Sequence, residues 1–188
     1  MDVFDNLCGK LLIAMPDMGD PRFSGSVIYI CDHSDEGAMG LIVNKPIPQL
    51  RLKALLEQMS IPTSADARDM AVHFGGPVEK QRGFVLHDGA YRSGDNTVPV
   101  TDDVCMTGTR DVLEALAQGQ GPTSCLMALG YAGWSPGQLE SEITQNAWLT
   151  GEATPQLLFG RAHEHKWTGA LRAIGIDPLL LSAAGGHA

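Results

Sequence analysis

The sequence predicts one folded domain, spanning residues 1–188, in which β-strands and helices are mixed. A chain of 188 residues is long enough for one substantial hydrophobic core, since domains commonly contain about 100 to 200 residues. Hydrophobic residues make up 44% of the chain and charged residues 19%, as in an ordinary globular protein. Short β-branched runs and longer amphipathic segments both occur, which indicates both kinds of element.

Strands are expected in the first quarter of the chain. The runs KLLIAMP, SVIYICDH and MGLIVNKP are apolar and separated by clusters of Gly, Pro and Asp that mark turns. The polar segment HSDEGAMG joins the last two as a hairpin. An amphipathic helix that stops before Pro62 follows, because apolar residues recur there at spacings of three and four: Leu52, Leu55, Leu56 and Met59.

The rest of the chain alternates strands and helices. Strands are expected in MAVHFGGPV, RGFVLHDG and QLLFG, and the nearly continuous apolar run SCLMALGYAG predicts a strand buried on both faces. Helices are expected in TGTRDVLEALAQGQG, GQLESEITQNAW and EHKWTGALRAIG. Residues 91–103 are polar and turn-rich around a short strand at 98–100, which predicts a long surface excursion. The triplet Gly75-Gly76-Pro77 predicts a tight turn with close backbone approach.

The charge of the chain disfavours direct binding to nucleic acid. Lys and Arg number 13 against 22 Asp and Glu, which gives a formal charge of -9, and such a charge repels the phosphates of DNA and RNA. Asp2 and Asp5 stand where a secretory signal would carry positive charge. No apolar run approaches the roughly 18 residues of a membrane helix. We therefore expect a cytoplasmic protein with no membrane association.

No cofactor or metal site is expected. The chain has four cysteines, which lack the short spacings of a zinc site and are expected to be reduced thiols: Cys8, Cys31, Cys105 and Cys125. The last three have apolar surroundings, where a free cysteine behaves as a small buried hydrophobe. His163 and His165 are two positions apart, a spacing that does not direct two side chains to one ligand on a helix. No Walker A pattern is present.

One motif raises the alternative of a hydrolase. The stretch from Gly133 to Gly137, GWSPG, has the spacing G-x-S-x-G of a nucleophile turn, with Ser135 at its centre. A predicted strand precedes it and a predicted helix follows it, as such a turn requires. Asp177 and His187 come later in the chain, in the Ser, Asp, His order of an α/β-hydrolase.

A structural role explains Ser135 better. Pro136 is favoured at the first position of a helix, and Gln138 completes the capping box S-x-x-Q with Ser135. Pro136 also lacks the backbone N–H that would be one of the two oxyanion donors. Loss of such a donor typically costs about 10² to 10³ in rate. We predict that Ser135 caps a helix.

Four stretches of the chain carry the motifs of a known family. They are LIAMPDMGDPRFSGSVIYICDHSDEGAMGLIVNKP, FGGPVEKQRGFVLH, ALGYAGWSPGQLESEITQNAWL and AGGHA. In this order, over nearly the whole chain, they resemble the YqgE/AlgH family of bacterial proteins. The resemblance implies an α+β fold, with a single domain of coiled, bifurcated mixed β-sheets flanked by helices. It also implies that a small residue other than serine is common at the position of Ser135, which agrees with the structural role.

The resemblance implies little about activity. Members are mostly described as uncharacterised, and one branch has been labelled a transcriptional regulator, a role that an acidic chain would exert through a protein partner. No reaction, cofactor or catalytic set transfers from the family. Our first hypothesis is a non-catalytic cytoplasmic binding or regulatory module for a protein partner or a small ligand.

The alternative hypothesis is an enzyme that acts on a small polar or anionic substrate in a cleft between the sheets. Its candidate residues are polar members of the family motifs that a hydrophobic core does not need: Asp20, His33, Asn44, Arg82 and His87. Asp20 would orient the substrate, His33 or His87 would act as acid or base, Asn44 would donate a hydrogen bond, and Arg82 would clamp an anion. Each also has a structural explanation, such as an Arg82–Glu79 pair. The enzyme hypothesis requires that several of these residues converge on one pocket.

Overall fold

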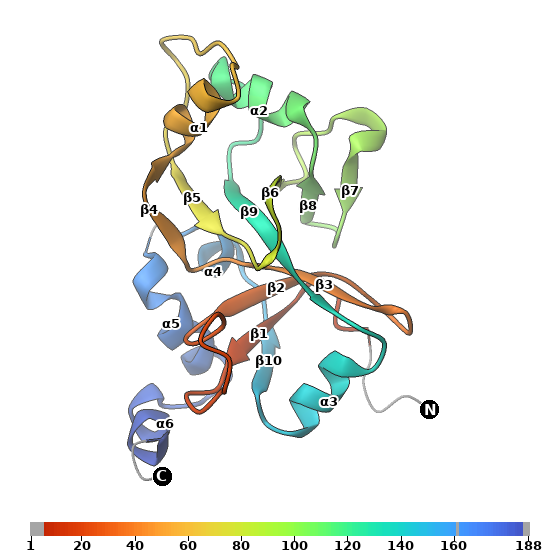
Figure 1. The fold of residues 1–188 in the computed structure, drawn as a ribbon, viewed down its shortest axis with the longest axis vertical. Helices are drawn as coiled ribbons and strands as arrows, with labels where there is room; N and C mark the ends of the chain where they lie inside the picture. The colour runs from red at the N-terminus through yellow and green to blue at the C-terminus, as the bar shows by residue number, and fades with distance from the viewer. Residues whose placement is uncertain (1–5, 161, 186–188) are drawn as a thin grey trace.

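The structure is a computed structural model that describes residues 6–160 and 162–185 (Figure 1). Its strands belong to one 10-stranded sheet. They are β1 Lys10–Ala14, β2 Val27–Ser34, β3 Gly37–Ile42, β4 Pro46–Arg51, β5 Ala71–Phe74, β6 Val78–Asp88, β7 Thr97–Pro99, β8 Val104–Thr107, β9 Cys125–Trp134 and β10 Trp148–Glu152. The helices are α1 Leu52–Gln58, α2 Arg110–Ala117, α3 Gln138–Thr144, α4 Pro155–Phe159, α5 Lys166–Ala173 and α6 Pro178–Gly185. Two short 3-10 turns are η1 Gly94–Asn96 and η2 His163–His165.

The sheet branches at β9. The strand order is β10-β1-β2-β3-β9-β6-β8-β7, and β4 joins through β5, which also pairs with β9. β9 therefore pairs with β3 and β6 in the antiparallel sense and with β5 in the parallel sense. The lower strands in Figure 1 cross the upper ones at a steep angle, with β9 running through both groups. This single α+β domain with a bifurcated mixed sheet confirms the predicted fold class.

Strand β9 is central to the fold because its side chains pack in three hydrophobic clusters. Leu126 and Ala128 pack with residues of β1, β2 and α5, whereas Met127 packs with residues of α1 and α2. Successive side chains of a strand point to opposite faces. The two faces of β9 therefore pack in different clusters, and this strand is buried on both faces, as predicted. Near its end, Trp134 joins a third cluster with residues of β1, β2 and β10.

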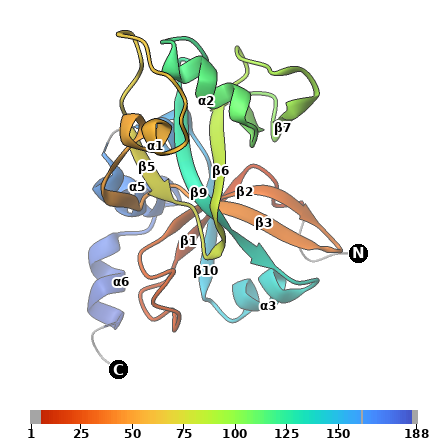
Figure 2. The ribbon, with the colours of Figure 1, turned by 45° about the horizontal axis from the view of Figure 1, so that its top comes forward.

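The helices cover the sheet from two sides. α1 and α2 lie over the upper strands, and α4, α5 and α6 lie along one flank (Figures 1 and 2). Both upper helices bury an apolar face, and in α1 this face contains the predicted Leu52, Leu55 and Leu56. α1 ends before Pro62, as predicted. In the described part of the chain, no helix has both the length and the apolar character needed to cross a membrane.

Two elements near the C-terminal third differ from the prediction. QLLFG was predicted to be a strand, but it belongs to α4, because Pro155 starts the helix and the Thr154 side chain accepts a hydrogen bond from the N–H of Leu157 at 3.2 Å. The helix predicted to reach Trp148 ends at Thr144. Asn146 then adopts a positive φ of 61°, which breaks the helix and lets Trp148–Glu152 pair with β1 as β10.

Two glycines allow the turn after β5 and strand β9 to approach closely. A Cβ atom on Gly76 would lie 2.0 Å from the carbonyl carbon of Tyr131, and one on Gly130 would lie 2.3 Å from the carbonyl oxygen of Gly76. Both residues have positive φ, 156° and 77°. The close backbone approach predicted for the Gly75-Gly76-Pro77 turn is confirmed.

Candidate functional site

A pocket of about 370 Å³ opens where the loop between β1 and β2, the start of β6, the end of β9 and helix α3 meet. Its apolar wall contains Met18, Phe23, Pro77, Val78 and Trp134. We call it the Trp134 pocket. Its volume lies within the range of about 300 to 1,000 Å³ that is typical of small-molecule sites.

The sequence around this pocket is the sequence that carries the family resemblance. Every residue that lines it lies within residues 12–46, 74–87 or 128–149, which are the three long stretches quoted above. The pocket is therefore the place where those stretches, distant in the chain, come together.

Glu142 of α3 organises the floor of the pocket. Its Oε1 accepts hydrogen bonds from the indole N–H groups of Trp134 and Trp148, at 3.2 and 3.0 Å. Its Oε2 accepts one from the side-chain amide of Gln138 at 2.9 Å. The two indole rings pack edge to face with centroids 6.3 Å apart, and Phe23 packs against Trp148 in the same way at 5.8 Å. A single carboxylate thus fixes both indole rings.

His33, near the end of β2, holds α3 in place through a hydrogen bond to Glu140. Its Nδ1 accepts a hydrogen bond from the backbone N–H of Leu7 at 2.9 Å. Nδ1 therefore carries no proton, and Nε2 must donate its proton to Oε1 of Glu140, 2.5 Å away. This hydrogen bond from His33 lowers the pKa of Glu140. The contact joins neutral His33 at the end of β2 to the helix that carries Gln138 and Glu142.

Asp20 stands on the wall of the pocket and is already paired. Its carboxylate accepts two charge-assisted bonds from Arg22, with Nη2–Oδ2 and Nε–Oδ1 distances of 2.7 and 3.0 Å. These bonds from Arg22 lower the pKa of Asp20. The Arg22 guanidinium also lies over the ring of Phe23, 5.6 Å from its centroid. The Asp20–Arg22 pair stabilises the loop beside the apolar wall.

Asn44 fastens the same loop to the sheet. Its side-chain oxygen accepts a hydrogen bond from the N–H of Val27 at 2.9 Å, and its amide donates to the carbonyl oxygen of Gly25 at 2.8 Å. Lys45 donates to the carbonyl oxygen of Arg22 at 3.1 Å. Asn44 therefore positions the pocket wall without lining it.

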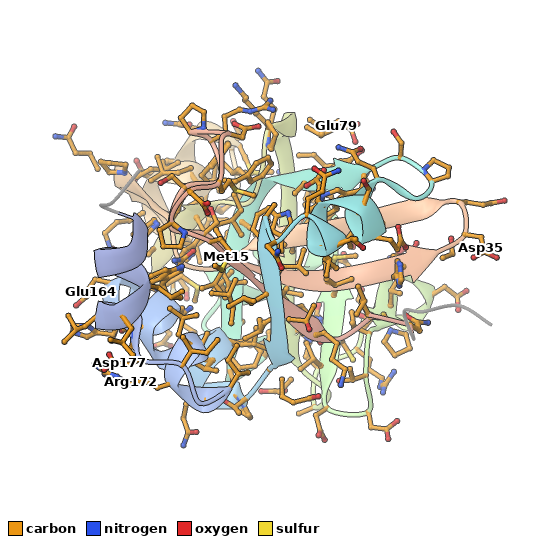
Figure 3. The ribbon with its side chains drawn as sticks, turned by 90° about the horizontal axis from the view of Figure 1, so that it is seen from below. Met15, Asp35, Glu79, Glu164, Arg172 and Asp177 are labelled. Carbon is orange, nitrogen blue, oxygen red and sulfur yellow. The ribbon has the colours of Figure 1, made fainter. Side chains whose placement is uncertain are left out.

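Arg82 and His87 lie on β6, away from the Trp134 pocket. Nη1 of Arg82 lies 3.5 Å from Oε2 of Glu79, a residue at the edge of the molecule in Figure 3. The Arg82 guanidinium packs over the ring of Phe84. His87 is buried and lies 2.7 Å from both the carbonyl oxygen of Asp88 and the hydroxyl of Thr107. Burial lowers the pKa of His87. Of the five predicted residues, then, Asp20 lines the pocket, His33 and Asn44 support it, and Arg82 and His87 make separate contacts.

The prediction that the Ser135 side chain caps α3 was wrong. The helix begins two residues later than predicted, at Gln138, and its N-cap is Gly137 with a φ of 76° and no side-chain cap. Only the reverse half of the capping box forms, in which the backbone N–H of Ser135 donates to the side chain of Gln138 at 3.0 Å. Ser135 is exposed, and His187 of the hydrolase alternative lies outside the described residues.

Sequence reasoning did not single out Glu142. One local signal was available, because Gln138 and Glu142 are four residues apart and so share a face of a helix. Its bond to Trp148, however, depends on α3 turning back against β10, which no local pattern reports.

The fold defines a class of small α+β proteins built on a branched sheet, and the Trp134 pocket lies beside the branch. The chain belongs to the AlgH-like family, whose model matches residues 11–179. A UPF0301 protein of Cereibacter sphaeroides is 56% identical over 183 residues, which cover 97% of this chain and 100% of that one. A UPF0301 protein of Paracoccus denitrificans is 53% identical over 190 residues, with both chains covered completely.

Two solved structures have the same fold. The solution structure of the AlgH protein from Pseudomonas aeruginosa matches with a TM-score of 0.79 and 40% identity, over 100% of both chains. The crystal structure of protein DIP2367 from Corynebacterium diphtheriae matches with a TM-score of 0.74 and 20% identity, over 98% of this chain and 94% of that one. The second match shows the fold alone.

Proposed function

We propose that this chain is a non-catalytic cytoplasmic binding module that holds a short segment of a partner protein in the Trp134 pocket. The observation that carries the proposal is the lining itself, in which apolar side chains surround the Trp134 indole, held by Glu142, and every lining residue comes from the family stretches. Rigid aromatic side chains in a pocket are typical anchors of protein interfaces. A regulatory role would then be exerted through that partner.

The charges of the pocket favour a segment that carries an apolar side chain next to a basic one. The lining contains two carboxylates, Asp20 and Glu142, against one guanidinium, Arg22. A carboxylate has about four acceptor positions, and Glu142 uses three of them. The formal charge of -9 attracts a basic partner and repels nucleic acid.

The side chains of this pocket support binding more than turnover. Among the described residues, its lining has no histidine, cysteine or serine, the residues that most often supply bases and nucleophiles. The Asp20 carboxylate is held in its charged form by Arg22. The wall and floor are instead fixed by internal hydrogen bonds, as a preformed binding surface requires.

The three indole N–H signals of the protein provide the test. Nitrogen–proton correlation spectra would be recorded during titration with the blocked peptides Gly-Leu-Arg-Gly and Gly-Leu-Glu-Gly. We expect the arginine peptide to shift the signals of Trp134 and Trp148. The signal of Trp167, whose indole N–H donates to the carbonyl of Ala14, is the internal control and should not move.

Variants locate the binding surface. Val78→Glu, at the lip of the pocket, should abolish the shifts, whereas Val98→Glu, at another exposed apolar position on β7, should leave them unchanged. Shifts that are identical for both peptides, or that survive Val78→Glu, would contradict the proposal.

A further inference from the structure

A second and larger pocket lies at the other end of β9, outside the three long family stretches except at Pro46. Its volume is about 660 Å³, and β4, β5, β9, α4 and η2 all contribute to its lining. We call it the His163 pocket. Its polar side chains include Arg51, Arg68, His73 and His163, and its apolar part includes Leu126 and Phe159.

The protons on its two histidines can be assigned from their contacts. Nδ1 of His73 lies 3.2 Å from the carbonyl oxygen of Met127, which can only accept, so Nδ1 carries a proton. His73 is 2% exposed, and burial, followed by the nearby His163 and Lys166, lowers its pKa to about 3. His73 is therefore neutral, and its Nε2 is an acceptor.

The assignment of His73 determines that of His163. Nδ1 of His163 lies 3.1 Å from Nε2 of His73, so it must donate its proton to that acceptor. Burial, followed by the charge of Lys166, lowers the pKa of His163, which keeps it neutral near pH 7. Its Nε2 then carries a lone pair and no proton. The hydrogen bond to His73 thus fixes the tautomer of the His163 imidazole. In this tautomer Nε2 of His163, a residue of the pocket lining, is a hydrogen-bond acceptor.

Two cationic groups accompany this acceptor, Lys166 close to His163 and Arg68 in the same pocket lining. The Lys166 ammonium is buried and donates to the carbonyl oxygens of Val43 and Leu158, at 2.8 Å each. Arg68 donates to the carbonyl oxygen of Pro122, and within residues 6–160 and 162–185 it forms none of the ion pairs. A guanidinium has five N–H donors, so Arg68 keeps donors for a ligand. Arg51, by contrast, is paired with Asp69 at 3.3 Å.

A guanidinium and a fixed imidazole acceptor in the lining of one pocket match one kind of anion. A phosphate monoester has a second pKa of about 6, so slightly above this pH part of it remains a monoanion, which presents charged oxygens together with an O–H donor. A carboxylate or a sulfate ester supplies the oxygens but no O–H at this pH, and would leave Nε2 of His163 without a partner. The volume exceeds that of a phosphate group, and Leu126 and Phe159 favour an apolar remainder.

We propose that the His163 pocket binds a small phosphate monoester with an apolar organic part, with Arg68 holding the phosphate oxygens and His163 accepting its O–H. This site is separate from the Trp134 pocket and does not depend on the function proposed for it. Arg68 and His163 come from segments far apart in the chain, so only the folded protein presents them together.

Calorimetric titration at about pH 6.5, where both phosphate forms are populated, tests the proposal. The probes are phenyl phosphate, phenyl sulfate and inorganic phosphate. We expect one binding site for phenyl phosphate, with an affinity about tenfold or more above that for phenyl sulfate, because the sulfate leaves a polar group unpaired. Inorganic phosphate should bind more weakly than phenyl phosphate, since it lacks the apolar part.

Matched variants assign the contacts. His163→Phe and Arg68→Met should each weaken phenyl phosphate binding about tenfold or more, whereas His165→Phe and Arg172→Met should not change it. His165 is an exposed neighbour on the same 3-10 turn, and Arg172 lies at the edge of the molecule (Figure 3). Arg68→Lys keeps the charge and provides a second variant if the methionine variant does not fold.

Three results would overturn the proposal. They are the absence of phenyl phosphate binding, equal affinity for phenyl sulfate, and equal losses in the His163 and His165 variants. Long-range nitrogen–proton spectra of the imidazoles give an independent readout, since we expect a proton on Nδ1 and none on Nε2 of His163 in the free protein. A proton found on Nε2 would also exclude the proposed contact.

Discussion

The imidazole of His33 donates its Nε2 proton to the carboxylate of Glu140 at 2.5 Å. The bond joins residues that are 107 positions apart and fixes α3 against the end of β2. The side chain of His33 is 7% exposed and that of Glu140 is 28% exposed, so water weakens this bond less than it weakens the surface ion pairs of the molecule.

Removal of the Glu140 carboxylate should therefore destabilise the fold. We expect Glu140→Ala to lower the free energy of unfolding by about 1.5 to 3 kcal/mol at pH 7, the usual contribution of a hydrogen bond to a charged group. Because His33 lowers the pKa of Glu140, this contribution is present above the ordinary glutamate pKa and is lost as the pH falls through the lowered value. Urea unfolding at pH 7 and at about pH 3 should show a difference from the parent protein that shrinks in acid.

The control for this prediction is Glu114→Ala. Glu114 forms an exposed pair with Arg110 four residues away, and such a pair contributes at most about 0.5 kcal/mol. If the two variants lose the same free energy of unfolding, the His33–Glu140 bond contributes no more to stability than an exposed ion pair.

Glu142→Leu should have a larger effect. The leucine side chain is of similar size, but it leaves the buried indole N–H groups of Trp134 and Trp148 without their acceptor. Each unsatisfied buried donor costs about 1 to 3 kcal/mol, so we expect a total loss of about 2 to 6 kcal/mol for the two. Chemical unfolding followed by circular dichroism measures the loss, and the Trp167 indole signal should keep its position. Unchanged stability would mean that water replaces the carboxylate as the acceptor of the two indole N–H groups.

Acid should destabilise the protein through His73. Its pKa is about 3 when folded and about 6.5 when unfolded. Between these values the unfolded chain binds a proton that the folded chain does not, so stability is full above the unfolded value and falls as the pH decreases toward 3. At about 1.4 kcal/mol per pKa unit, His73 should account for a loss of about 3 kcal/mol between pH 7 and pH 4.

The measurement compares urea unfolding of the parent protein and of His73→Gln over this pH range. Their difference in stability should narrow as the pH falls, because the glutamine cannot bind the proton. His165→Gln, which removes an exposed histidine, should give a curve parallel to that of the parent. A His73→Gln curve that is also parallel to the parent would show that His73 titrates normally in the folded state.

Close approach of the turn after β5 to strand β9 predicts a difference between two glycine substitutions. A Cβ atom at Gly130 would lie 2.3 Å from the carbonyl oxygen of Gly76, whereas one at Gly94 would meet nothing within 4 Å. Both positions have positive φ, 77° and 54°, which alone costs an alanine about 1 to 2 kcal/mol. We expect Gly94→Ala to lose about that amount and Gly130→Ala at least about 2 kcal/mol more. Equal shifts in thermal unfolding would show that the backbones separate easily.

Elements with a strong local pattern were predictable from the sequence. α1 and α2 follow from leucines at helical spacing, and β9 follows from an unbroken apolar run. α4 and β10 were missed because their signals are short. α4 depends on Thr154 and Pro155 at its start, and β10 on a positive φ at Asn146.

The candidate sites were predictable only in part. Asp20, His33 and Asn44 were candidates because they are polar members of the family motifs. In the structure Asp20 lines the Trp134 pocket, and His33 and Asn44 contact the elements that form it. Their partners could not be inferred, because the contacts of His33 and Asn44 cross between distant elements. The pair of His73 and His163, separated by 90 positions, has no local signal of any kind.

The branching of the sheet at β9 has a consequence for how the molecule opens. β9 pairs with three strands, and it carries Trp134 at one pocket and Leu126 at the other. Subglobal opening around either pocket breaks the pairing of only part of β9. Its central amide hydrogens should therefore be among the slowest to exchange with deuterium, at a rate set by complete unfolding of the chain.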